Sequence, residues 1–322
     1  MSTSEYQTRS FVAVNQNDQV REYSSSGGVF YEIAKFVIES GGVVFGAAFD
    51  EDGQVSHKSC DSMDSLADLM QSKYVQSNMG GTYKEVAEVL ERGGLVLFSG
   101  TPCQVYGLLS YLNTSKVGTD NLITVDIVCH GVPSRKIWRL YLDEISQGRH
   151  PSNINFRDKT NGWRDFSLRI DYSDGSRYIQ SKNTDPYMQG FLKNLYLRES
   201  CYNCQFRGVD RLSDFTIADF WKVKDFLPEL YDDRGTSVVM VHNNKAQHIL
   251  ESLRDNMALR EIDNDVIVQT NSPVMRSVKR NPKRDVFFRT FSMEKNVGEQ
   301  IAVTIRTPFL RRVLGKVKRM VK

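Results

Sequence analysis

Apolar and polar positions follow two rhythms along the first half of the chain, one helical and one extended. Between residues 27 and 39 apolar side chains recur every three or four positions, with Ser26 as a candidate N-cap. The apolar run 43–49 then predicts a strand. The same succession predicts helices over 81–92, 103–112 and a segment after Pro133, with short buried strands over 95–98 and 122–128. Strands that alternate with helices predict an α/β domain over residues 1–150.

The second half shows a different pattern, in which extended segments are paired before a helix follows. Residues 166–172 alternate apolar and polar side chains, and Asp174-Gly175 predicts a hairpin turn. Further elements follow, namely a helix over 186–197, strands over 214–218 and 237–241, and a helix over 244–254. We therefore expect an α+β domain over residues 151–262 and mixed sheets flanked by helices in the fold as a whole. A basic extension over 263–322 completes the chain.

The final segment, 306–322, contains seven basic residues and no acidic residue, and its apolar side chains fall on one helical face. A basic amphipathic helix can lie on an anionic membrane surface, which would make the protein peripheral at the inner face of the membrane. The alternative is a terminal helix that packs on its own domain with a solvated basic side. Sequence leaves both interpretations open.

Composition excludes several classes of protein. The 322 residues are 40% hydrophobic and carry a net charge of +3, so the overall charge gives no reason to expect nucleic acid. No stretch is apolar for long enough to span a membrane, and the first residues lack a secretory signal pattern, so we expect a cytoplasmic protein. Five cysteines in such a chain are expected to be buried thiols, catalytic thiols or metal ligands.

Four of these cysteines are placed where a metal centre could form. Cys201 and Cys204 form a Cys-x-x-Cys pair, which lets two thiolates reach one metal site. Cys103 follows the strand expected over 95–98, and Cys129 follows the strand expected over 122–128. Ligands bind at the carboxyl ends of strands in open α/β sheets, so the four thiolates could converge on zinc or on a [4Fe–4S] cluster. Unrelated buried cysteines remain the alternative, and Cys60 has the sequence context of a structural thiol.

Two further motifs have the composition of a cofactor site. SSSGG at 24–28 opens the first long helix, and free N–H groups at such a position can bind a phosphate. SKYVQS at 72–77 offers a lysine beside an aromatic ring. Taken singly, each motif is equally well explained by an ordinary helix cap or by a surface lysine beside a core tyrosine.

Seven motifs follow one another in a characteristic order: SSSGG, SKYVQS, GTPCQ, VCHGVPS, SCYNCQF with a downstream Arg and Asp, DFW, and DRGTS. In this order they resemble the coenzyme F-420 hydrogenase/dehydrogenase beta-subunit family, from about residue 20 to residue 255. The form of the motifs is most similar to the bacterial members associated with surface polysaccharide biosynthesis.

The resemblance implies a flavin, expected to be FAD, beside one [4Fe–4S] cluster. The family's cluster cysteines match Cys103, Cys129, Cys201 and Cys204. The family's flavin-binding positions match Ser26, Gly27, Gly28, Ser72, Lys73 and Tyr74.

Two departures from the family pattern change the expectation. Ser26 stands where archaeal members often carry an acid, which affects the polarity around the flavin and the choice of hydride partner. The cysteine-rich ferredoxin-like domain of many bacterial members is missing from the sequence. We therefore expect a separate ferredoxin-like electron donor, or direct exchange between the flavin and a soluble carrier.

The resulting expectation is a flavin- and [4Fe–4S]-dependent oxidoreductase that passes electrons between a one-electron donor and a two-electron, hydride-transferring substrate. The resemblance to polysaccharide-associated members implies a small-molecule substrate, either a nucleotide sugar or a lipid-linked sugar, in surface polysaccharide biosynthesis. The alternative is a non-catalytic, zinc-stapled binding module in a polysaccharide assembly complex.

Other polar residues are candidates for supporting roles. His130 adjoins a candidate ligand and could tune the cluster or supply a proton. Arg157, Asp158 and Lys159, with Trp163, could frame an anionic substrate or could be a hairpin edge with solvated charges. Arg211, Asp214 and Asp219 could orient the loop that carries the cysteine pair through buried ion pairs.

Overall fold

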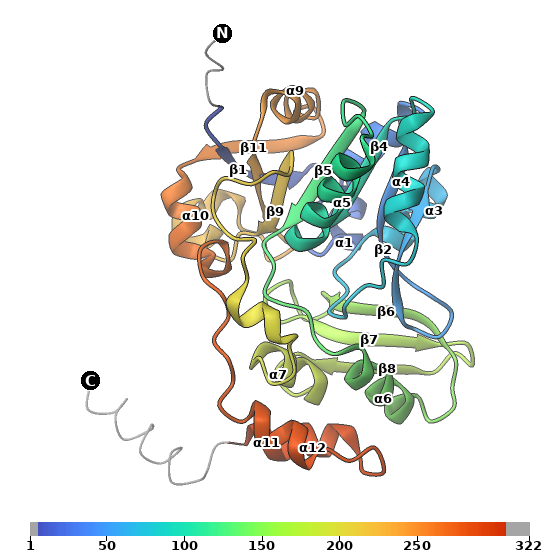
Figure 1. The fold of residues 1–322 in the computed structure, drawn as a ribbon. Helices are drawn as coiled ribbons and strands as arrows, with labels where there is room; N and C mark the ends of the chain where they lie inside the picture. Colours follow the sequence, from blue (N-terminus) through green and yellow to red (C-terminus); the bar gives the residue numbers. More distant parts are fainter. Residues whose placement is uncertain (1–5, 307–322) are drawn as a thin grey trace.

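The computed structural model describes residues 6–306, which form a large mixed sheet flanked by helices and a smaller sheet beside it (Figure 1). The large sheet contains β1 (Arg9–Asn15), β2 (Val43–Phe49), β3 (Val55–Cys60), β4 (Val96–Gly100), β5 (Leu122–Ile127), β9 (Phe215–Asp219), β10 (Ser237–Val241) and β11 (Met257–Ile262). The small sheet contains β6 (Pro151–Asp158), β7 (Ser167–Tyr172) and β8 (Arg177–Ser181). This architecture confirms the expected fold class.

Helices cover both sheets. Those nearest the large sheet are α1 (Asp18–Tyr23), α2 (Val29–Glu39), α3 (Met63–Leu69), α4 (Thr82–Glu91), α5 (Pro102–Ser115), α9 (Asn244–Ser252) and α10 (Asn264–Thr270). The others are α6 (Arg135–Ser146), α7 (Pro186–Leu192), the short α8 (Val223–Phe226), α11 (Arg284–Thr290) and α12 (Val297–Ile305). α2 shows how the sequence pattern works, because Ile33, Ala34 and Val37 recur at helical spacing and all three are fully buried.

The strand order of the large sheet brings distant parts of the chain together. The order is β11-β1-β10-β9-β5-β4-β2-β3, and the neighbours β2, β4, β5 and β9 run parallel. β1 is antiparallel to β10, which is antiparallel to β9, so β1 points the same way as β9. The carboxyl ends of β1, β2, β4, β5 and β9 therefore lie along one edge of the sheet. Ligands of open α/β sheets bind at this edge.

The small sheet lies beside this carboxyl edge (Figure 1). It belongs to the long connection between β5 and β9, and it has an aromatic core of its own that includes Trp138, Phe156, Tyr187 and Tyr196. The division of the chain at residues 150 and 262 stays a prediction. Both the segment 1–150 and the segment 151–262 supply strands to the large sheet.

Most predicted elements are present, with one clear difference. The helix expected over 186–197 ends at Leu192, because Asn194 adopts a left-handed conformation (φ 58°) and the N–H of Leu195 bonds back to the carbonyl of Gly190 at 2.9 Å. β1, β3, β6 and β11 are strands that the pattern did not indicate.

Within residues 6–306 no helix combines the length and the apolarity needed to cross a bilayer. The amphipathic segment predicted at 306–322 lies, beyond Arg306, outside the described residues.

Candidate functional site at the carboxyl edge of the sheet

The first candidate ligand, Cys103, lies in the first turn of α5, directly after β4. Thr101 caps this helix, and Gln104 returns a bond to the N–H of Thr101 at 2.8 Å, so the turn is fixed by a capping box. The hydroxyl of Thr101 lies 3.1 Å from the sulfur of Cys103. Cys103 is exposed, as a ligand at the rim of a site would be.

One glycine turn connects the second and third candidate ligands. Cys129 follows β5, and Gly131 then adopts φ +132°, a conformation that L residues rarely take. A Cβ at position 131 would lie 3.3 Å from the Cβ of Cys201, so the turn brings the backbone close to the cysteine pair. The next N–H, of Val132, points to the sulfur of Cys201 at 3.5 Å. Sequence reasoning did not single out Gly131, although it stands inside VCHGVPS.

Cys201 lies in a short 3-10 turn, Glu199–Asn203, that follows α7, and Cys204 comes directly after this turn. The N–H of Cys204 donates to the hydroxyl of Ser277 at 3.0 Å, which anchors the pair to the C-terminal part of the chain. Arg211 then binds the loop to β5, because its guanidinium donates to the Asp126 carboxylate at 2.9 Å and both side chains are buried. Arg211 thus forms a buried ion pair, as expected, but its partner Asp126 was not suggested by the sequence. Asp214 pairs with Lys245 instead, and Asp219 pairs with Arg157.

The four thiols are close enough to influence one another. Burial raises the pKa of the Cys129 thiol to about 12, and negative charge on Cys103, Cys201 and Cys204 adds to the rise. Burial also raises the pKa of Cys201, with contributions from Cys103 and Cys204. Thiols in this arrangement resist ionisation unless a cationic centre compensates for their charge.

Cysteine thiols are the donors that an iron–sulfur cluster takes. Among residues 6–306 no group of three or more His, Cys, Asp or Glu side chains is arranged to hold a metal ion, so the arrangement alone does not establish a metal centre. A tetrahedral zinc would need four ligands around a single point, whereas a [4Fe–4S] cluster is a larger group held by four cysteine thiolates. The N–H groups that face the sulfurs of Cys129 and Cys201 are of the kind that set the potential of such clusters. Cys60 lies at the opposite edge of the sheet, buried at the end of β3 beside Val44.

The glycine loop is packed between β1 and β10 at the same carboxyl edge. A Cβ at Gly27 would lie 2.3 Å from the carbonyl oxygen of Ala13, so only glycine fits there. Gly28 has φ +89° and begins α2 without a side-chain cap, which leaves N–H groups of the first turn without a side-chain acceptor. The hydroxyl of Ser26 donates to the carbonyl of Thr236 at 2.9 Å.

The lysine–tyrosine segment contacts this loop directly. The N–H of Ser72 donates to the hydroxyl of Ser25 at 2.7 Å. Lys73 donates to the carbonyl of Asp68 at 2.8 Å and to the carbonyl of Met70, and burial lowers the pKa of its ammonium to about 7. The ring of Tyr74 stacks on Phe191, with centroids 4.8 Å apart.

A buried arginine joins these pieces. Arg157 donates to the Tyr74 hydroxyl at 3.1 Å, to the Ser25 carbonyl at 3.1 Å and to the Asp219 carboxylate at 2.9 Å. Trp163 donates from its ring nitrogen to the same carbonyl and the same carboxylate, at 3.1 and 3.2 Å. The side chain of Arg157 is 2% exposed and both of its terminal nitrogens are bonded inside the protein, so it is not the solvated hairpin edge of the alternative interpretation.

Lys159, which was expected to share the role of Arg157, also donates to backbone carbonyls, those of Arg21 and Arg234. Burial lowers its pKa to about 8. Asp158 is buried and pairs with Arg169 at 3.4 Å. Lys159 and Asp158 therefore hold loops around the site in place and do not form an open binding site for an anion.

His130 lies between the cysteines and α7. Asn194 donates from its amide nitrogen to the carbonyl of Lys279, so its oxygen accepts from Nε2 of His130 at 2.7 Å. Burial lowers the pKa of this histidine. It is therefore a neutral, oriented donor next to Cys129.

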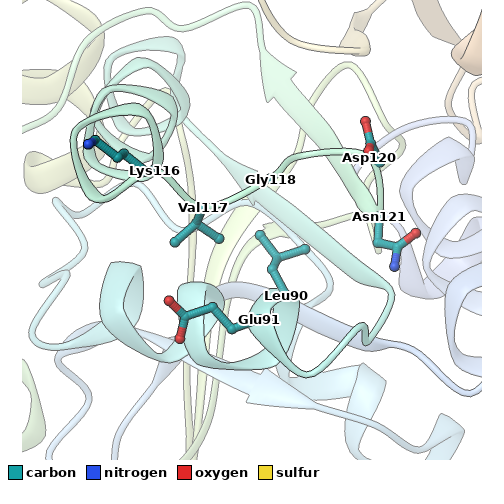
Figure 2. Close-up of a pocket in the computed structure, with 7 residues that line it drawn as sticks. All are labelled: Leu90, Glu91, Lys116, Val117, Gly118, Asp120 and Asn121. Carbon is teal, nitrogen blue, oxygen red and sulfur yellow. The ribbon is translucent and has the colours of Figure 1, made fainter.

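A pocket in the protein lies at the other end of the sheet. It is lined by Leu90, Val117, Asn121 and their neighbours, at the amino end of β5 (Figure 2). The candidate site at the carboxyl edge does not include it.

Comparison with known proteins identifies relatives of this arrangement. A family model for the C terminus of the coenzyme F420 hydrogenase/dehydrogenase beta subunit matches residues 93–265, more than half of the chain. Among solved structures, a chain of the F420-reducing [NiFe] hydrogenase complex from Methanosarcina barkeri, a xenon derivative, superposes with a TM-score of 0.56. It is 13% identical, with 88% of this chain and 99% of that chain covered, so the likeness concerns the fold. No curated protein matches the sequence.

Proposed function

Because the chain belongs to the coenzyme F420 hydrogenase/dehydrogenase beta-subunit family, we propose that it is an oxidoreductase with one [4Fe–4S] cluster beside FAD. A flavin supplies two-electron hydride chemistry, and a cluster supplies one-electron transfer. Together they can convert between one-electron and two-electron transfer. The single observation that supports this most directly is geometric: Cys103 and Cys129 follow the neighbouring strands β4 and β5 at the carboxyl edge, and the Gly131 turn brings the segment of Cys129 against Cys201.

Cys103, Cys129, Cys201 and Cys204 are the proposed cluster ligands. Gly131 and Val132 would orient two of the thiolates through backbone N–H groups, and the Arg211–Asp126 ion pair would fix the loop that carries the Cys-x-x-Cys pair. His130 would act beside them as a hydrogen-bond donor at Nε2, held in one tautomer by Asn194.

Ser26, Gly27, Gly28, Ser72, Lys73 and Tyr74 are the proposed flavin-binding positions. The N-terminus of α2 would bind the phosphates, because its first N–H groups have no side-chain cap. Lys73, with a pKa near 7, could hold or release a proton at Nζ under neutral conditions. The Arg157–Asp219 pair would keep the two flavin-binding segments together.

The partners are proposed to be a separate ferredoxin-like protein and a small-molecule substrate, with a nucleotide sugar or a lipid-linked sugar of surface polysaccharide biosynthesis as the candidates. The solved relative comes from a multi-subunit hydrogenase complex, which supports partnership with other subunits. The proposed cluster would use four of the five cysteines, and the fifth, Cys60, is buried.

The deciding experiment is an anaerobic purification followed by an absorption spectrum, with iron, sulfide and flavin assays on the same sample. Flavin bands above a broad iron–sulfur absorption that dithionite bleaches, with about four irons per chain, would support the proposal. A colourless protein that contains zinc, and that stays colourless after cluster reconstitution and addition of FAD, would refute it.

A further inference from the structure

Two segments of the chain meet around the Cys-x-x-Cys pair. Residues 193–212 carry the pair, and residues 271–285 run beside them between α10 and α11 (Figure 1). The N–H of Cys204 donates to the hydroxyl of Ser277 at 3.0 Å. Three further bonds join the segments: Asn194 to Lys279, Arg207 to Met275 and Gly208 to Val274. We call the exposed face of these two segments the cysteine-pair surface.

The cysteine-pair surface is basic. Its two segments contain nine Lys and Arg against three Asp and Glu, a net charge of +6, whereas the complete chain carries only +3. The remainder of the chain is therefore net negative. Two of the three acids, Glu199 and Asp285, already pair with Arg280, and the third, Asp210, accepts from the hydroxyl of Thr8 at 3.0 Å.

Several cations of this surface have no acidic partner. Arg211 is buried and pairs with Asp126, so it adds nothing to the exposed charge. Four exposed cations form no salt bridge among residues 6–306, namely Lys193, Arg198, Arg276 and Lys279. An excess of uncompensated positive charge at one place on a protein attracts partners of negative charge.

The segments that carry the other two candidate ligands add no opposing charge. Residues 101–115 and 127–134 contain no Lys, Arg, Asp or Glu. Tyr106, three residues after Cys103, packs edge-on against Phe206 of the cysteine-pair surface, with ring centroids 4.9 Å apart. Cys103 is itself exposed. The candidate ligands therefore reach the outside of the protein beside the unpaired cations.

Two of the cations lie directly beside the cysteine pair. The carbonyl of Arg198 accepts from the N–H of Cys201 at 2.9 Å, and its positive charge opposes the rise in the pKa of that thiol. Arg276 adjoins Ser277, the partner of the second cysteine, and follows Met275, which is 46% exposed. Met and Arg are enriched at the contact surfaces of protein complexes.

We propose that the cysteine-pair surface is the docking surface for an acidic iron–sulfur protein that donates electrons one at a time. The proposal rests on the proposed function, because a cluster on the four cysteines exchanges single electrons with its partners. In each encounter the reduced carrier would lose one electron and the cluster held by this chain would gain it, with no bond made or broken. Complementary charge would guide the carrier to this face and give a transient, salt-sensitive complex.

The test measures binding of the full-length protein, purified and reconstituted without oxygen, to a purified acidic two-cluster ferredoxin by isothermal titration calorimetry. Binding by the parent protein should weaken steeply as the salt concentration rises. Arg276→Glu and Lys279→Glu together should weaken binding at low salt by about tenfold or more. The milder pair of changes, Arg276→Gln and Lys279→Gln, should give an intermediate affinity.

The matched control carries Arg92→Glu and Lys116→Glu. Arg92 directly follows α4 and Lys116 directly follows α5, so both exposed cations lie at the end of these helices away from Cys103. The control lowers the net charge by the same four units and should bind within about twofold of the parent. A basic one-electron carrier such as cytochrome c should not bind the parent. Circular dichroism melting curves should show that every variant is folded.

Iron content and absorption spectra of the same samples separate this proposal from the proposed function. A protein that takes up a cluster and does not bind the ferredoxin would overturn the docking surface alone. A change at Arg276 and Lys279 that leaves binding intact, or an equal loss in the matched control, would overturn it as well. A protein that takes up no cluster would overturn the proposed function on which the docking surface rests.

Discussion

The guanidinium of Arg157 lies 2.9 Å from the carboxylate of Asp219, and this buried ion pair connects the small sheet to the end of β9 in the large sheet. The same guanidinium reaches Ser25 before the glycine loop and Tyr74 in the lysine–tyrosine segment. One side chain thus holds three separate segments that the proposed flavin site requires.

Replacing Arg157 should lower the free energy of unfolding. Arg157→Met leaves Asp219 without its partner, and breaking a buried ion pair in this way typically costs about 3–5 kcal/mol of unfolding free energy. Chemical denaturation followed by circular dichroism measures this loss, and flavin fluorescence titration should show weaker binding in parallel. Arg280→Met is the matched control, because Arg280 pairs with Glu199 and Asp285 at an exposed surface. An equal loss of stability in both variants would contradict the role given to Arg157.

Alanine at position 27 should disturb the glycine loop. Its Cβ would lie 2.3 Å from the carbonyl oxygen of Ala13, so the loop must move away from β1. We expect a loss of about 1–3 kcal/mol in unfolding free energy, as is usual when a packed site is overfilled, and a markedly higher dissociation constant for FAD. Gly118→Ala, where a Cβ would meet no atom within 4 Å, should change neither quantity. Unchanged FAD affinity in the Gly27→Ala variant would argue against a flavin at this loop.

The cysteines provide a comparison inside one chain. Cys129→Ser should lower the iron content and remove most of the iron–sulfur absorption after anaerobic reconstitution, because the thiolate is a proposed ligand. Cys60→Ser is the control, since Cys60 is buried at the opposite edge of the sheet. Equal iron in the two variants would show that Cys129 does not hold a cluster.

A buried histidine should make stability depend on pH. His57 lies between the hydroxyl of Ser77 and the carbonyl of Ser99, at 2.7 and 3.0 Å, and burial lowers its pKa from 6.5 to about 4. Below pH 6.5 the unfolded chain binds a proton that the folded protein does not bind. Stability should therefore fall as the pH is lowered from 6.5 to 4, by up to about 1.4 kcal/mol per pH unit.

The contribution of His57 can be isolated by comparison with a His57→Gln variant. The difference in unfolding free energy between the parent and this variant should shrink as the pH falls through that range. His248→Gln, at an exposed position, controls for the loss of a histidine. A difference that stays constant between pH 6.5 and 4 would contradict a neutral His57.

Periodicity and spacing predicted the central elements of the fold well. The strand expected over 43–49 and the helix expected over 27–39 are present, because the burial of a regular apolar face dominates their energetics. β1 was missed although it is almost completely buried, since a short apolar run in sequence does not reveal its partners. Its partners are β10 and β11, which follow more than 200 residues later.

Some residues of the candidate site could likewise be predicted from the sequence, and others could not. The positions of Cys103 and Cys129 at strand ends were predictable, because parallel strands carry their loops to a common edge. The role of Arg157 was not predictable, because a charged residue in a hairpin is ordinarily solvated and only tertiary packing buries it. Asp126 was missed for a related reason, since its partner Arg211 belongs to a loop 85 residues away.

The position of β1 also has a consequence for biosynthesis. Arg9 pairs with Val241, and Ser10 pairs with Ile262, so the first strand has no neighbours until almost the entire described chain has left the ribosome. Sheets closed by such distant pairings form slowly, and their unpaired edges are prone to aggregation until the partner strands have been synthesised. The glycine loop that follows β1 is packed against β10 and takes shape at the same late stage. We therefore expect cofactor capture to follow synthesis, and we expect nascent chains shorter than about 260 residues to depend on chaperones.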